Sequence, residues 1–137
     1  MMKNIIVIGL SIFLFVIGCT LPAFHMQEKI IYGWFAFVFG ALSPAFFPDG
    51  GAWFANIFYF ASVATIKVAT KLSIILSCIG IVISLDTYNI HQMWINEAHM
   101  APVIALGSGF YCWLSAQAVV LIYAIYTAYI EPNITYT

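Results

Sequence analysis

Charged residues are so scarce in this chain that they divide it into long apolar runs, and this constrains the fold more than any other feature. Of the 137 residues, 7% are charged and 64% are hydrophobic, whereas ordinary soluble domains carry about 25% charged residues. A soluble fold of this length cannot bury so much apolar surface. We therefore predict that residues 1–137 form a single integral membrane domain.

The apolar segments between the charges predict where the chain crosses the bilayer. A helix needs about 20 residues to cross roughly 30 Å of hydrocarbon. Five segments qualify as candidates, because a charge at the bilayer centre is costly and the charges must lie between spans. They cover residues 5–24, 30–47, 51–67, 70–86 and 103–130.

The lysines favour four crossings over five. Lys residues near span ends are retained on the cytoplasmic side of a membrane. With Lys3 inside, five crossings would leave Lys29, Lys67 and Lys71 outside, whereas four crossings place only Lys29 outside. The N- and C-termini are then both cytoplasmic, and we expect the protein in the inner (cytoplasmic) membrane of a bacterium.

Residues 30–47 are the segment that we expect not to cross. Gly33, Gly40 and Pro44 interrupt it, and such breaks free backbone groups that lipid cannot satisfy. The predicted fold class is therefore all-α: a polytopic four-helix bundle with one re-entrant or interfacial broken helical segment between the first and second spans.

Small and polar residues inside the spans predict the helix contacts. Ser73, Ser77, Gly80 and Ser84 recur at spacings of four, three and four, which places them on one stripe of a helix. Small residues let helices approach closely in lipid. Gln117 lies near mid-depth of the last span and needs a hydrogen-bonding partner there. We predict that these five residues pack the bundle.

No pattern of catalytic residues accompanies the spans, so we predict a non-enzymatic protein without a cofactor. The net charge of −1 offers no basic surface for nucleic acid. His25, His91 and His99 share the outward side with acidic residues, but their spacing matches no metal-ligand motif. A haem or quinone site is a further alternative, with His25 and His91 ending spans on one side. Cys19 follows Val16-Ile17-Gly18, which resembles a lipoprotein cleavage box, although the apolar run continues beyond it.

The outward side offers more exposed chain than the cytoplasmic side, and we expect it to bind another protein. Partners other than the lipid bilayer would be a membrane or periplasmic protein or a second copy of the chain. The function predicted is that of an accessory subunit, an assembly factor or a toxin-immunity protein, and the alternative is an oligomeric channel or small transporter. The residues predicted to bind the partner are Trp34, Asp49, Trp53, His91, Trp94, Glu97 and His99.

About a quarter of the chain carries a resemblance to known sequences. Leu21-Pro22-Ala23-Phe24, Gly33-Trp34, Gly40 and Ala52-Trp53-Phe54-Ala55-Asn56 follow one another here. The pattern resembles uncharacterised small bacterial inner-membrane proteins with four predicted spans, in which a Gly-Trp segment precedes Ala-Trp-x-Ala-Asn-Pro. Ile57 stands here in place of that proline. The resemblance implies a four-span architecture with the second span starting near Trp53, and it implies no activity.

Overall fold

The computed structural model describes residues 2–41, 50–96 and 99–130. It is mostly helical and carries one small sheet. The helices are α1 (Met2–Thr20), α2 (Gly33–Gly40), α4 (Ala55–Thr65), α5 (Thr70–Leu85) and α6 (Ser108–Tyr129), with short 3-10 turns η1 (Gly50–Phe54) and η2 (Asp86–Asn89). The strands are β1 (Pro22–Met26), β2 (Ile30–Tyr32), β3 (Gln92–Asn96) and β4 (His99–Leu106).

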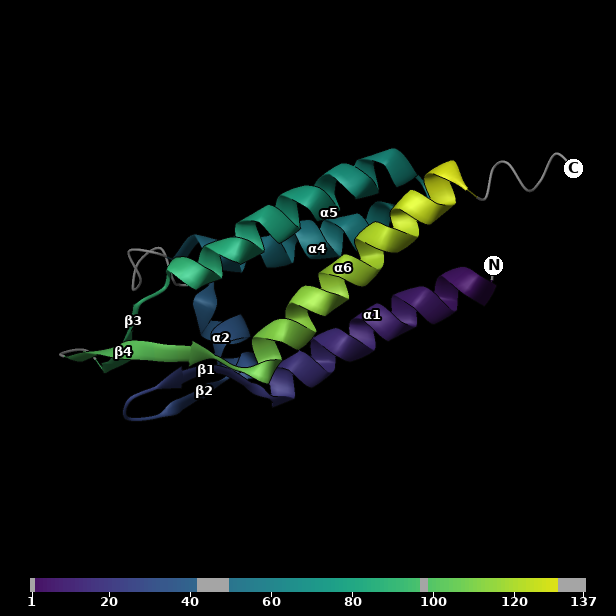
Figure 1. Cartoon of the computed structure of the whole chain (residues 1–137). Helices are drawn as coiled ribbons and strands as arrows, with labels where there is room; N and C mark the ends of the chain where they lie inside the picture. The colour runs from purple at the N-terminus through teal and green to yellow at the C-terminus, as the bar shows by residue number, and fades with distance from the viewer. Residues whose placement is uncertain (1, 42–49, 97–98, 131–137) are drawn as a thin grey trace, which may run out of the picture.

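Four helices lie side by side, and the sheet lies at one end of them (Figure 1). α6 packs along α1 and α5, and α5 packs along α4. The start of α1, the turn between α4 and α5 and the end of α6 lie together at the opposite end (Figure 1). The short helix α2 lies near the sheet and does not run the length of the bundle.

The sheet joins two hairpins that are far apart in the sequence. Its strand order is β2-β1-β4-β3, and each neighbouring pair is antiparallel, with Phe24 opposite Leu106 and Met93 opposite Ala101. Ala23, Phe24, Met26, Ile31, Met93 and Ala101 form a buried cluster, with Phe35 and Ala36 of α2 packed against it. The mostly helical prediction is confirmed, but the all-α fold class is wrong because these four strands are present.

The strands also correct the predicted span boundaries. α1 ends at Thr20, so residues 22–24 of the first predicted span belong to β1. Residues 103–106 belong to β4, and the helix of the last predicted span begins only at Ser108. The predicted loop 87–102 contains β3 and the start of β4. β1 and β4 pair with each other across the sequence, and β3 pairs with β4, which follows it directly.

The other segments agree more closely with their predicted bounds. α5 covers 70–85, where 70–86 was predicted, and η1 with α4 covers 50–65, where 51–67 was predicted. The broken segment 30–47 contains β2 and α2, and Pro44 lies outside the described residues.

Two helical segments, Thr70–Asn89 and Ser108–Tyr129, are long and apolar enough to cross a membrane. α1 contributes a shorter apolar stretch, Ile5–Thr20, and α4 has 11 residues. By length and composition, two of the described helices could cross a membrane, and this test does not support the predicted four-span bundle.

The exposed side of α5 is more apolar than its buried side. Ser73, Ser77, Gly80 and Ser84 are its buried residues, whereas Leu72, Ile75, Ile79 and Val82 are exposed large hydrophobic residues. Water-soluble helices bury their apolar stripe instead. The arrangement on α5 is the one expected where the surroundings are hydrocarbon and small residues bring helices together.

Buried hydroxyl groups link the helices through hydrogen bonds. Ser11 Oγ of α1 lies 2.8 Å from Tyr59 Oη of α4 and donates to the Ala116 carbonyl of α6 at 2.8 Å. Ser73 Oγ donates to the Ser62 carbonyl at 2.8 Å, and Ser77 Oγ donates to Ser62 Oγ at 2.9 Å. Each bond satisfies a polar group that would otherwise be costly to bury.

Candidate binding site beneath the sheet

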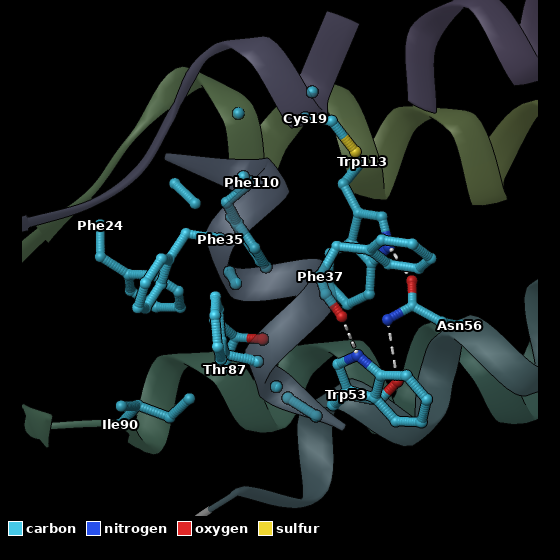
Figure 2. Close-up of a pocket in the computed structure, with 18 of the residues that line it drawn as sticks. Cys19, Phe24, Phe35, Phe37, Trp53, Asn56, Thr87, Ile90, Phe110 and Trp113 are labelled. Carbon is cyan, nitrogen blue, oxygen red and sulfur yellow. Dashed lines mark hydrogen bonds between the residues drawn. The ribbon is translucent and has the colours of Figure 1, made fainter. Parts of the chain in front are cut away.

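An apolar cavity of about 120 Å³ lies where the sheet meets the bundle. Its walls come from the end of α1, β1, α2, η1, the start of α4, η2, β3 and the start of α6 (Figure 2). Aromatic side chains dominate the lining: Phe15, Phe24, Phe35, Phe37, Phe39, Phe110, Trp53 and Trp113. The side chains of Cys19, Asn56 and Thr87 add the polar atoms. A mainly apolar cavity with a few polar groups is the usual form of a small-molecule site.

Glycines allow the backbones of α1, α2 and α6 to come into contact beside the cavity. A Cβ atom at Gly33 would overlap the carbonyl oxygen of Gly18, and one at Gly109 would lie 2.7 Å from the same oxygen. The Gly33 N–H donates to the Leu21 carbonyl at 2.9 Å. The starts of α2 and α6 therefore both press against the end of α1, and this close approach fixes two walls of the cavity.

A chain of hydrogen bonds joins α6, α4, η1 and α2 beside the cavity. Trp113 Nε1 donates to Asn56 Oδ1 at 2.8 Å, and Asn56 Nδ2 donates to the Trp53 carbonyl at 2.9 Å. Trp53 Nε1 then donates to the Phe37 carbonyl at 2.7 Å (Figure 2). Asn56 is 5% exposed, so its amide holds two indole-bearing segments in place within an apolar environment, where each bond is costly to leave unmade.

Some of the predicted partner-binding residues are exposed, and one lines the cavity. Trp34 on α2 is 53% exposed, and His91 between η2 and β3 is also exposed. Trp53 lies at the cavity wall instead of on the outer surface. Trp94 falls in β3 and His99 in β4. Asp49 and Glu97 lie outside the described residues.

The predicted packing residues lie between the helices. Ser73, Ser77, Gly80 and Ser84 are the buried residues of α5. Gln117 of α6 is 2% exposed, and its Nε2 donates to Ser84 Oγ at 2.7 Å. Gln117 Oε1 is buried without a hydrogen bond among the described residues.

Among the described residues, Trp53 is the one cavity residue that sequence reasoning selected as a site residue. Asn56, Trp113 and Thr87 are among the cavity residues that it did not select. Asn56 interrupts the apolar run of the second predicted span, and a lone amide in such a run signals a buried hydrogen-bond partner. Its partner Trp113 stands 57 positions later. Thr87 carries no comparable signal, because a threonine at a helix end is common.

The described residues place no group of three or more His, Cys, Asp or Glu side chains at metal-binding distance. The cavity is also small for a large cofactor, because sites for drug-sized ligands enclose about 300–1,000 Å³. The volume of about 120 Å³ lies below that range.

Comparison with known proteins finds no counterpart. No family model, no curated protein and no solved structure matches this chain.

Proposed function

We propose that this chain is a four-crossing protein of the bacterial cytoplasmic membrane and that its sheet binds another membrane or periplasmic protein outside the bilayer. α1, α4, α5 and α6 are the proposed crossings. α1 extends about 28.5 Å over its 19 residues at 1.5 Å per residue. η1 with α4 extends roughly 26.5 Å, because a 3-10 turn rises about 2.0 Å per residue. These lengths are close to the hydrocarbon thickness of about 30 Å.

The ends of the bundle support the proposed orientation. The start of α1, which contains Lys3, lies at the same end as the α4–α5 turn, which contains Lys67 (Figure 1). Lys71 follows in the first turn of α5. Lys29 stands between β1 and β2 at the sheet end. Three lysines on the cytoplasmic side and one outside agree with the retention of positive charge inside.

The short helix α2 gives the broken segment its role in this topology. β2 and α2 follow α1 at the sheet end, and η1, which leads into α4, begins at that end as well (Figure 1). A chain that leaves and re-enters the bundle at one end has not crossed between the two points. We therefore propose that the described part of the predicted segment 30–47, residues 30–41, is re-entrant or interfacial; residues 42–47 lie outside the described residues.

The observation that carries the partner-binding proposal is the edge of β3. β3 pairs with β4 on one side, and no strand among the described residues pairs with its other side. An edge strand presents unpaired N–H and C=O groups, to which an extended segment of a partner adds as a further strand. Exposed His91 and Gln92 lie beside and on this edge.

The channel alternative receives less support from the bundle. Buried serine hydroxyl groups bond to other hydroxyl groups and to carbonyls, as Ser11 does with Tyr59 and Ser77 does with Ser62, and Thr127 Oγ1 is a buried hydroxyl without a partner among the described residues. Polar groups that satisfy one another serve helix packing, whereas an aqueous path needs polar groups that face water.

Photo-crosslinking from the sheet edge tests the partner-binding proposal. A photoreactive amino acid at Gln92 should give one discrete adduct with a second protein in native membranes, because that position is exposed on β3. The matched control is Val68, which is 90% exposed in the turn at the opposite end; it should not give that adduct. Mass spectrometry identifies the adduct. No adduct from Gln92, or an adduct that contains only a second copy of this chain, contradicts binding of another protein.

A further inference from the structure

The cavity beneath the sheet has a size that limits its occupant to a small group. An apolar cavity of about 150 Å³ in another protein stays dry and binds benzene, and the cavity here encloses about 120 Å³. That volume is of the size that holds one ring. Met93 of β3 lines the cavity, whereas the proposed protein partner adds to backbone groups on the unpaired edge of the same strand.

The lining favours an aromatic or quinone-type ring over a saturated chain. Phe35, Phe37, Phe110 and Trp113 bring their ring systems to the cavity from α2 and α6 (Figure 2). Rings that stack with an offset or meet edge to face attract one another beyond the effect of the area that they bury. Rings on two facing elements can contact a planar ligand from both sides.

Two polar side chains supply a place for one oxygen atom. Thr87 is 3% exposed and lines the cavity, and its side chain carries a hydroxyl group that can donate or accept a hydrogen bond. Asn56 uses one donor and one acceptor in its bonds to Trp53 and Trp113, although an amide offers two N–H donors and two acceptor lone pairs. Both residues can therefore hydrogen-bond to an oxygen on a bound ring.

We propose that this cavity binds a single lipid-soluble six-membered ring that carries an oxygen atom, as in a phenol or a quinone head group. The ligand enters an apolar, aromatic site, and the Thr87 hydroxyl selects a ring with oxygen over the bare ring. This assignment does not depend on the partner-binding proposal, since the ring would contact side chains in the cavity and the partner would pair with backbone groups at the edge of β3.

Fluorine NMR of the full chain in detergent, labelled with 5-fluorotryptophan, tests the proposal with phenol and benzene as probes. Trp53 and Trp113 border the cavity, whereas Trp34 is exposed and serves as the reference. Phenol should shift the Trp53 and Trp113 signals saturably, and benzene should do so with a weaker affinity. Partition into detergent would instead shift all signals without saturation, and that outcome overturns the proposal.

Two variants separate ring binding from oxygen recognition. Thr87→Val keeps the shape and should weaken phenol binding roughly fivefold, with benzene binding unchanged, because one neutral hydrogen bond is lost. Ala52→Phe fills the cavity at a buried wall residue and should abolish the saturable shifts, whereas Val68→Phe in the exposed turn should not. Equal phenol affinity in Thr87→Val and the original chain, or saturable shifts that persist in Ala52→Phe, overturn the assignment.

Discussion

Replacing Gly109 by alanine should lower the free energy of unfolding by about 3 kcal/mol, at the upper end of the usual cost of overpacking. A Cβ atom at this position would lie 2.7 Å from the carbonyl oxygens of Gly18 and Leu21 and 2.8 Å from that of Pro22. All three are backbone atoms, so no side chain can rotate away. The start of α6 must then move from the end of α1. Detergent-induced unfolding followed by circular dichroism measures the loss.

Gly9→Ala is the matched control for this prediction. Gly9 also lies in a helix, but nothing lies within 4 Å of the Cβ atom that it would gain. Alanine is the better helix former by about 1 kcal/mol, so this variant should be as stable as the original chain or more stable. If Gly9→Ala and Gly109→Ala unfold alike, the close contact between α1 and α6 is not as described.

Replacing Asn56 by leucine should lower the free energy of unfolding by about 2–3 kcal/mol. The variant leaves the Trp113 indole N–H and the Trp53 carbonyl without the bonds that Asn56 provides at 2.8 and 2.9 Å. An unsatisfied buried polar group costs about 1–3 kcal/mol. Leucine has a similar size, so lost packing volume contributes little. Detergent-induced unfolding followed by tryptophan fluorescence also reports the changed surroundings of the two indoles.

Asn89→Leu tests whether the Asn56 effect arises from burial. Asn89 is exposed and donates to Asp86 Oδ1 at 2.9 Å, and surface substitutions of this kind change stability by about 0.5 kcal/mol or less. The same change of residue type should therefore have little effect at this position. Equal losses for Asn56→Leu and Asn89→Leu would remove the buried hydrogen bonds as the cause.

Local periodicity was enough to place α5 and its packing face. Ser73, Ser77, Gly80 and Ser84 recur at helical spacing, and the spacing alone puts them on one side of a helix. The structure buries these four residues. The packing face could be predicted because the spacing of residues within one helix is enough to define it.

The strands were missed because their signal is not local. Pro22–Met26 and His99–Leu106 continue the apolar runs of neighbouring helices, and a short apolar run reads as helix or strand equally well. What makes them strands is their pairing with each other, as in Phe24 opposite Leu106. A single sequence does not reveal a partner about 80 positions away.

The candidate site depends on contacts of the same long-range kind. Asn56 is visible as an isolated amide in an apolar run, but its bond to Trp113 spans 57 positions. The cavity exists because α2 packs against the end of α1, where Gly18 and Gly33 meet. Nothing in the sequence indicates that Gly18 and Gly33 are in contact. Neither the walls nor the volume of the cavity could therefore be predicted.

Cysteine labelling of the two ends of the bundle tests the proposed topology most directly. The three native cysteines, Cys19, Cys78 and Cys112, are first replaced by alanine, and single cysteines are placed at Val68 and His91, which are exposed at opposite ends. In intact spheroplasts a membrane-impermeant maleimide should label the cysteine at His91 and leave the one at Val68 unlabelled until the membrane is broken. Labelling at Val68 before lysis, or protection at His91, would contradict four crossings with the sheet outside.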